Sequence, residues 1–262
     1  MITDSFDYDR NALITPQGAL QDSVTACAGS FPLTTFIMVF SKRLMEALLE
    51  EKRIEPLHPD LALGTAAYKY PVCRVTGTDT GFLLSGVGAP AAAGAVEELN
   101  ALFPLKNLIL YGSCGTLTEL PEGTMIIPKQ AYRDEGTSYH YAPASDWITI
   151  PNSSRLETLF NSIEIRTVTG NTWTTDAFYR ETEARNQALV KQGCVCVEME
   201  CASIQAVCNY RGIEFYPFFY GADSLHGASW ARRILGDRSM NTTLACFEAA
   251  VKIADLLQKE SV

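Results

Sequence analysis

Two glutamates that flank a methionine, Glu198-Met199-Glu200, have residue types and a spacing that could hold a sugar. They follow the apolar segment 195–197, which we interpret as a short buried strand leading into a helix from about residue 199. A carboxylate at the end of such a strand can accept two hydrogen bonds from a vicinal diol, and the neighbouring thioether offers a polarisable apolar floor. The alternative interpretation is that both are ordinary acidic residues at a helix start, where the macrodipole favours them.

Asp223 has the setting of a general acid. It comes shortly after the apolar run 215–220, at the exit of a predicted buried strand, where burial raises the pKa of a carboxyl group. A carboxyl group tuned in this way can protonate a leaving group. The alternative is an Asx turn or a helix N-cap, which uses the same residue type.

Two glycine-containing turns predict one pocket at the carboxyl edge of a sheet. Residues 86–91 join a strand to a helix, where exposed N–H groups favour an anion, and residues 112–115 add the small hydroxyl of Ser113. The first turn also fits the G-x-G-x-x-A pattern of dinucleotide folds, but Pro90 interrupts it and the next strand lacks a terminal carboxylate. Plain tight turns are the alternative at both places.

The elements that must position these groups alternate along the chain. Strands are predicted at 36–40, 82–87, 107–111, 124–128, 165–170, 195–197 and 213–220, and helices at 42–52, 91–103, 180–192, 199–210 and from about 241. This alternation favours an α/β layered fold in a single domain over residues 1–262, with residues 1–35 as an N-terminal extension. Residues 134–154 fit no pattern and are expected to form a loop or a subunit contact.

Composition excludes several classes of partner. A net charge of −9 and a pI near 4.9 argue against nucleic acid, because such binding depends on Lys and Arg at phosphates. The apolar stretch 27–40 is broken by Gly29 and Pro32 and is too short to span a bilayer. A small-molecule ligand and no membrane contact are therefore expected.

The eight cysteines are expected to be free thiols in a reducing cytoplasm. They are scattered along a chain whose first residues, MITDSFDYDR, are acidic and polar and do not form a signal peptide. No second Cys or His pair accompanies Cys194 and Cys196 at zinc spacing, and the sequence has only three histidines. No metal site is expected.

Five segments, taken in order, resemble the motif series of the purine nucleoside and uridine phosphorylase family. They are residues 85–90, 111–115, 175–179, 197–203 and 222–224. The resemblance covers about residues 36–258, and its most specific part is Glu-Met-Glu. It implies a nucleoside phosphorylase fold with a central mixed, largely buried β-sheet flanked by helices, and a homo-oligomer of two to six subunits. Residues 133–141 are similar to a segment of bacterial members, and we assign them to structure or oligomer contacts.

The resemblance also implies roles for individual residues in cleaving an N-glycosidic bond. Glu200 would bind the ribose 2′- and 3′-hydroxyls, with Met199 beneath the sugar and Ser113 beside it. Phe178 and Glu198 would contact the base. Asp223 would protonate a purine at N7 as the catalytic acid.

A pyrimidine base is disfavoured but stays open as an alternative. Uracil-specific members of the family use a Gln and an Arg shortly after the aromatic residue, and here Thr182 and Ala184 stand at those places. Arg180 and Arg185 lie close in sequence and could substitute by a shift in register.

The phosphate pocket departs from the family pattern. Phosphorolytic members carry a Gly-Asp-Pro-x-Arg turn after the first strand, where this chain has Phe40 and Ser41, and an Arg where it has Leu110. Losing two charge-assisted partners would weaken phosphate binding by about 1.5–3 kcal/mol each. The residues left to bind phosphate, the expected co-substrate in an enzyme without other cofactors, are Gly88, Ser113, Lys42, Arg43 and Lys69.

The leading hypothesis is a purine-type nucleoside phosphorylase that yields free base and ribose 1-phosphate. A hydrolytic nucleosidase comes next, because the degraded phosphate pocket suits water. A non-catalytic nucleoside-binding protein and a dinucleotide-dependent oxidoreductase are the more remote alternatives.

Overall fold

The computed structural model describes residues 1–7, 12–20, 31–58, 61, 63–64, 70–227, 229–236 and 239–260. Ten strands are found in these ranges: β1 Thr35–Val39, β2 Ile54–Pro56, β3 Cys73–Val75, β4 Thr80–Leu84, β5 Asn107–Thr116, β6 Met125–Asp134, β7 Trp147–Thr149, β8 Val168–Thr175, β9 Cys194–Glu198 and β10 Glu214–Ser224. The helices are α1 Pro16–Ala19, α3 Lys42–Glu50, α4 Ala89–Leu102, α5 Ser153–Ser162, α6 Glu183–Val190, α7 Cys201–Arg211 and α8 Met240–Lys259, with short 3₁₀ turns η1 Ile2–Asp4, η2 Thr137–His140 and η3 Phe178–Arg180.

The strands form one mixed sheet in the order β10-β6-β8-β9-β5-β1-β4-β3-β2, with β7 added at β6. β5 is its central strand: it runs parallel to β1 and β10 and antiparallel to the end of β9. Because β10 also pairs with β6, the strands β5, β10, β6, β8 and β9 close into a ring. β5 therefore lies where this ring joins the rest of the sheet.

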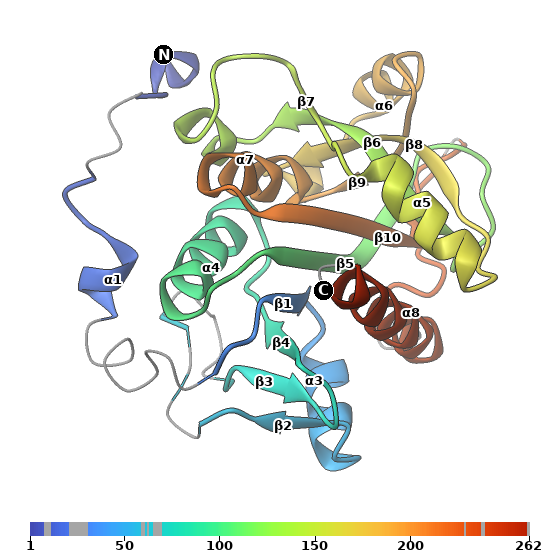
Figure 1. The fold of residues 1–262 in the computed structure, drawn as a ribbon. Helices are drawn as coiled ribbons and strands as arrows, with labels where there is room; N and C mark the ends of the chain where they lie inside the picture. The colour runs from blue at the N-terminus through green and yellow to red at the C-terminus, as the bar shows by residue number, and fades with distance from the viewer. Residues whose placement is uncertain are drawn as a thin grey trace.

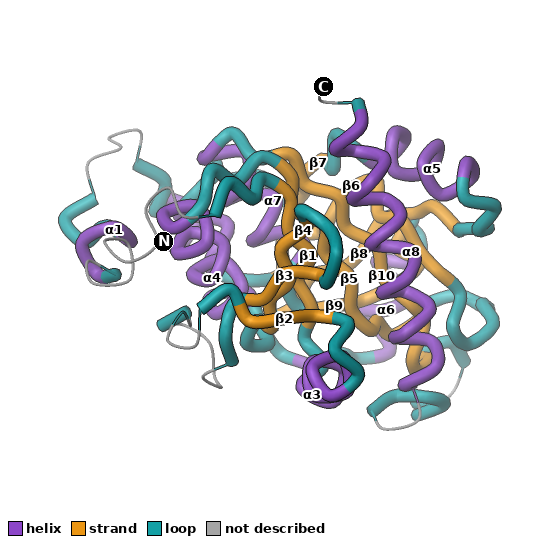
Figure 2. Tube along the Cα trace, turned by 60° about the horizontal axis from the view of Figure 1, so that its bottom comes forward, coloured by secondary structure: helices purple, strands orange, loops and turns teal. Residues whose placement is uncertain are grey.

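Helices cover both faces of the sheet, with α4 and α7 on one side and α5 and α8 on the other (Figure 1). Side chains alternate between the two faces along β1 and β5: Leu108 and Leu110 pack with α4 and α7, whereas Ile109 and Tyr111 pack with α3, α5 and α8. Figure 2 shows the long helix α8 running along its face of the sheet. Strands buried on both faces explain the continuous apolar runs in the sequence.

The start and end signals read from the sequence explain several helix boundaries. Ser41 caps α3 by accepting a bond from the Leu44 N–H at 3.2 Å, and Thr182 caps α6 through the Arg185 N–H. Gly193 has φ of 88° after α6, where glycine is favoured. The helix predicted at 180–192 therefore begins three residues later, because Thr182 is its cap and Arg180 belongs to η3.

Two predictions about strands need correction. The strand predicted at 124–128 continues to Asp134, and the strand predicted at 165–170 lies at Val168–Thr175. Both extensions consist mostly of polar residues, and their pairing with one another, with β7 and with β9 forms them despite that composition. Residues 134–154 are also more ordered than expected, since they hold η2, β7 and the start of α5.

The observed α/β fold, a mixed β-sheet flanked by helices, confirms the fold predicted from the sequence. β1 begins at Thr35, and the division of the chain at residue 35 stays a prediction. The seven cysteines that the structure describes are buried free thiols, and Cys27 lies outside the described residues. No helix in the described part of the chain is long and apolar enough to cross a bilayer.

Candidate active site

Strand pairing brings the two carboxylate motifs to the same point on β5. Gly115 pairs with Val197 of β9 on one side and with Asp223 of β10 on the other. A side chain at position 115 would collide with Leu225 and Val197, at 2.5 and 3.1 Å from its Cβ. A side chain here would have to displace Leu225, so a glycine fits best where these three strands meet, and the residues after Val197 face Asp223 across it.

Asp223 reaches this position through an irregularity in β10. The pairing with β5 shifts register between Gly221 and Asp223, as in a β-bulge, which re-aims the side chains that follow. The hydroxyl of Thr116 fixes the bulged backbone by donating to the Asp223 carbonyl oxygen at 3.1 Å.

Glu198 organises the turn from β9 into α7. Its Oε1 accepts bonds from the hydroxyls of Thr174 at 2.6 Å and Thr172 at 3.2 Å, and its Oε2 accepts from the N–H groups of Glu200 and Cys201 at 2.7 and 2.6 Å. Four donors thus surround one buried carboxylate, and two of them are orphan amides of a helix start. These contacts favour positioning of the turn as the role of Glu198, and its predicted contact with the base stays a prediction.

Glu200 is held in place by Gly88, from the turn between β4 and α4. The Gly88 N–H donates to Glu200 Oε1 at 2.6 Å, across 112 residues of sequence. Gly88 has φ of 98°, in the region that favours glycine. The first glycine turn therefore contributes to the site by fixing the carboxylate predicted to bind ribose.

The two glutamates share a strongly desolvated environment. Burial raises the pKa of Glu200 to about 8, and the nearby charge of Glu198 adds to that rise. Burial likewise raises the pKa of Glu198 to about 7, although its four donors oppose the rise. Hydrogen bonds donated by two sugar hydroxyls would favour the ionised form of Glu200 and lower its pKa.

Asp223 is buried, with 3% of its surface exposed, and its carboxylate Oδ2 accepts a bond from the indole N–H of Trp230 at 2.6 Å. Burial raises the pKa of Asp223, while the Trp230 bond and the charge of Arg233 lower it. A desolvated carboxyl group with a raised pKa has the properties predicted for the general acid.

A cavity of about 120 Å³ joins these groups. It is lined by Phe40, Val87, Ser113, Cys114, Gly115, Phe178, Glu181, Val197, Glu198, Met199, Glu200, Asp223 and Leu235. The structure thus brings together every residue predicted to contact ribose or base. Phe178 is 38% exposed, at the edge of this cavity, and its ring meets that of Tyr179 edge-on.

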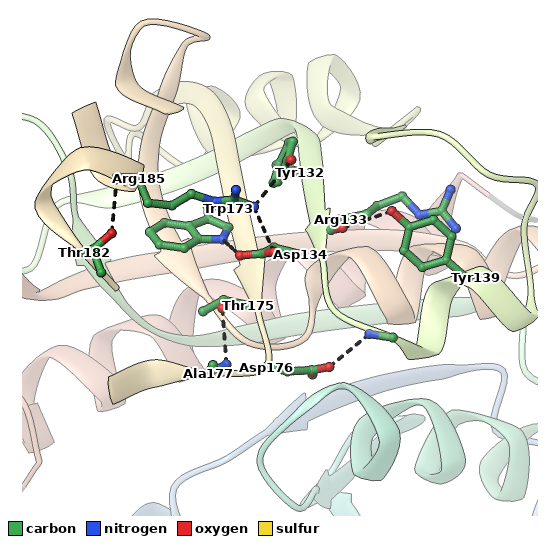
Figure 3. Close-up of polar contacts among 11 residues, drawn as sticks. Tyr132, Arg133, Asp134, Tyr139, Trp173, Thr175, Asp176, Ala177, Thr182 and Arg185 are labelled. Atoms are coloured by element: carbon green, nitrogen blue, oxygen red, sulfur yellow. Dashed lines mark hydrogen bonds and ion pairs between the residues drawn. The ribbon is translucent and has the colours of Figure 1, made fainter. Parts of the chain in front are cut away.

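A polar network fixes the segment that presents Phe178 (Figure 3). Asp134 accepts bonds from the indole of Trp173 and from the guanidinium of Arg185, both at 2.9 Å, and Asp176 accepts from the Gly136 N–H at 2.9 Å. Arg185 is therefore engaged with β6, which weakens the proposal that it could read a uracil ring.

Three of the predicted phosphate-binding residues line a second, larger cavity that adjoins the first through Phe40, Val87, Ser113 and Leu235. Its volume is about 610 Å³, and Ser41, Lys42 and Arg43 from the start of α3 contribute to its wall, together with Ser113. Lys42 also forms an ion pair with Glu46 at 3.6 Å. Three of the five predicted phosphate ligands thus meet here.

The other two residues predicted to bind phosphate are Gly88, which is not among the residues that line this cavity, and Lys69. The Gly88 N–H is already donated to Glu200. Lys69 lies outside the described residues. Leu110, at the position where phosphorolytic relatives place an Arg, is fully buried in the core beneath α4 and α7.

Sequence patterns did not reveal two residues beside Asp223 in the smaller cavity. Glu181 lines it beside Asp223, and Trp230 is bonded to Asp223. Glu181 lies three residues after Phe178, so a carboxylate close to the aromatic residue predicted to flank the base was a usable signal. Trp230 gave no signal, because its contact depends on the path of the loop after β10.

Comparison with known proteins finds relatives of this chain in sequence and in fold. The chain is 28% identical over 158 residues to a guanosine phosphorylase of Halorubrum lacusprofundi, covering 59% of this chain and 65% of that relative, less than two thirds of its length. In fold it is similar to a purine nucleoside phosphorylase from Toxoplasma gondii, with a TM-score of 0.72 and 19% identity over 88% of this chain and 94% of that one. An AMP nucleosidase from Bacteroides thetaiotaomicron gives a TM-score of 0.71 at 16% identity, over 94% and 100% of the two chains.

Relatives of these kinds include both phosphorylases and a nucleosidase, enzymes that cleave glycosyl bonds. The profile of one family, described as the phosphorylase superfamily, matches residues 34–248, which is most of the chain and includes every motif of the site. The protein belongs to the phosphorylase superfamily.

Proposed function

We propose that the protein cleaves the N-glycosidic bond of a purine nucleoside with phosphate as the nucleophile, releasing the base and ribose 1-phosphate. The observation that carries the proposal is that Glu200 and Asp223 face one cavity, with Met199 and Phe178 on its wall. Such an arrangement has an acceptor for a ribose diol at one end and a desolvated acid for the leaving base at the other.

Each group has a step in this reaction. Glu200, held by Gly88, would accept the 2′- and 3′-hydroxyls and so fix the sugar for attack at C1′. The transition state has oxocarbenium character, and the anionic oxygens of phosphate and the surrounding carboxylates would stabilise it. Asp223 would donate a proton as the bond to the base breaks. The electron pair of that bond then remains on a neutral base.

The residues around Asp223 favour a purine over a pyrimidine as the leaving base. A carboxyl group can donate to N7 of a purine, whereas uracil offers no such ring nitrogen and needs an amide and guanidinium clamp. The guanidinium of Arg185 is paired with Asp134. The guanosine phosphorylase named above also supports a purine substrate.

Phosphate as the nucleophile is supported by the second cavity. Ser41, Lys42, Arg43 and Ser113 line it, and it opens onto the sugar end of the smaller one through Ser113 and Val87. A cationic side chain beside a helix start is a favourable setting for a phosphate dianion.

Water is the second candidate nucleophile, and two observations favour it. The Gly88 N–H, predicted to bind phosphate, is taken by Glu200, and Leu110 lies in the core where relatives place an Arg. A hydrolase with the same ribose and base contacts would give free ribose in place of ribose 1-phosphate.

The deciding experiment measures release of free base from guanosine, inosine, adenosine and uridine, with and without phosphate. We expect release from purine nucleosides that stops when phosphate is removed, with ribose 1-phosphate as the second product. Undiminished release of free ribose in phosphate-free buffer would establish the hydrolase. No release from any of these nucleosides would overturn the proposed function.

A further inference from the structure

Glu181 is a carboxyl group that the motif series does not explain. It follows η3 and lines the smaller cavity beside Asp223, on the side that also holds Phe178. It also borders an outer groove whose wall includes Asn186, Leu225 and Trp230. Glu181 therefore stands between the base end of the cavity and the groove outside it.

Glu181 is half-buried, and the described protein groups around it do not stabilise an ionised carboxylate. Among the residues that the structure describes, none donates a hydrogen bond to it, and the interaction it does have is repulsion by Asp223. Asp223, in contrast, accepts a bond from Trp230 and feels the positive charge of Arg233. Two carboxyl groups that face one small cavity are disfavoured as a doubly charged pair and titrate together.

A proton bound by this pair is thus expected to reside on Glu181, while Asp223 keeps its Trp230 bond. Burial, with the charge of Asp223 as the second cause, raises the pKa of Glu181 to about 7. The other ionisable groups facing this region are Glu198, Glu200 and Cys114 on the cavity wall, Glu183 on the groove side, and Arg233 near Asp223. Most are acidic, so they favour retention of the proton.

We propose that Glu181 is a second catalytic carboxyl group, which with Asp223 holds the one proton given to the departing base. The proposal rests on the proposed function and deepens it. As the N-glycosidic bond breaks, its electron pair goes to the base, a ring nitrogen of the base takes the proton from the pair, and both carboxyl groups are left ionised. After the base leaves, the pair takes up one proton from a hydronium ion or a buffer acid, which reaches Glu181 by the outer groove.

The test compares Glu181→Gln with the wild-type enzyme over a range of pH, on guanosine and on 7-methylguanosine. The second substrate has an alkylated N7, so its base leaves without taking a proton there. We expect Glu181→Gln to lose about 10–100-fold in kcat/KM on guanosine at pH 7.5 and less than about 3-fold on 7-methylguanosine. Because Asp223 alone would lose its proton at lower pH, the fall of kcat/KM with rising pH should move down by about one pH unit or more.

Glu51→Gln is the control, since Glu51 is an exposed carboxylate after α3 that lines neither the two cavities nor the outer groove. It should behave as wild type. An unchanged pH profile in an active Glu181→Gln variant, or an equal loss on both substrates, would overturn the role of Glu181 and leave the proposed function standing. A wild-type enzyme that releases no base from either substrate would overturn both.

A direct titration keeps the inference testable if a variant folds poorly. The carboxyl carbon of Glu181, followed by ¹³C NMR in the wild-type protein, should titrate near neutral pH, and Asp223→Asn should lower its pKa by removing the like charge. Titration of Glu181 near 4.5 in the wild-type protein would contradict the shared proton.

Discussion

The two adjoining cavities differ in how their polar groups are held. In the smaller one, Glu198 has four donors and Glu200 is fixed by Gly88, so each carboxylate is positioned by another part of the site. In the larger one, of about 610 Å³, the cations Lys42 and Arg43 on the wall both come from the first turn of α3, and Lys42 pairs with Glu46 of the same helix. Positioning of this kind is expected where a sugar must be oriented for reaction, whereas a mobile dianion can be held by charge alone.

This difference shows that the smaller cavity depends on more of the fold than the larger one does. The smaller cavity draws on β5, β8, β9, β10 and the turn before α4, which come together only when the ring of strands is closed. The larger cavity receives its cations from one helix start next to β1. Substitutions in the first should therefore affect catalysis most, and substitutions in the second should affect phosphate affinity.

The largest effect is expected from Glu200→Ala. Removing the diol acceptor should lower turnover of ribonucleosides by about 10⁴-fold or more, because the sugar is no longer oriented at C1′. Steady-state kinetics would measure the loss, and circular dichroism would check that the fold survives. Glu200→Gln, which retains an acceptor for the Gly88 N–H, controls for collapse of the turn. Near-normal turnover by the alanine variant would show that the sugar lies elsewhere.

Asp223→Asn should have the next largest effect. The amide can still accept the Trp230 bond but supplies no acid, so cleavage of purine nucleosides should slow by about 10²–10⁴-fold. Substrates with activated leaving groups should be spared, because they depart without a proton. Comparison of kcat/KM on the two substrate classes measures this difference. Equal losses on both would point to a structural role for Asp223 in β10.

Much of the smaller cavity could be predicted from sequence because its residues sit at strand ends. Apolar runs before residues 112, 198 and 223 marked three of these ends, and the carboxyl edge of an α/β sheet is where they meet. Sequence patterns did not predict which strands pair when they lie far apart in the chain. The strand β8 is polar, and its register with β6 and β9 brings Thr172 and Thr174 to Glu198. The same limit hid Trp230, whose bond depends on the fold of a loop.

The larger cavity was less predictable for a different reason. Its cations lie in the α3 segment, as the sequence indicated, but the availability of a donor depends on its existing partners. Gly88 shows this limit: the turn has the predicted form, yet its N–H is spent on Glu200. A pattern of residues predicts which groups approach a site and does not predict which of them are already bonded.

Substitution of Lys42 or Arg43 tests whether the larger cavity binds phosphate. Lys42→Ala and Arg43→Ala should each raise KM for phosphate by about 10-fold, with kcat and KM for the nucleoside nearly unchanged, since a charge-assisted contact contributes about 1.5–3 kcal/mol at most when fully used. Initial rates at varied phosphate measure this. Lys52→Ala, an exposed lysine just after the same helix, serves as the control. Variants with unchanged phosphate dependence would place the nucleophile outside this cavity.

The smallest effect concerns stability, and it follows from the burial of the carboxylates in the smaller cavity. Burial raises the pKa of Glu200 from 4.5 to about 8, so between these values the folded protein retains a proton that the unfolded chain has released. Since the folded state then binds more protons, the free energy of unfolding must fall as pH rises through this window. Glu198, whose pKa is raised to about 7, acts in the same direction.

We therefore expect a Tm that is lower at pH 8.5 than at pH 6, and a weaker dependence of Tm on pH in Glu200→Gln, which has no proton to lose. Thermal unfolding of both proteins, without nucleoside or phosphate, measures the two slopes. An identical slope in the variant would mean that Glu200 is ionised in the folded protein throughout this range, and the smaller cavity would then be more strongly solvated than its burial indicates.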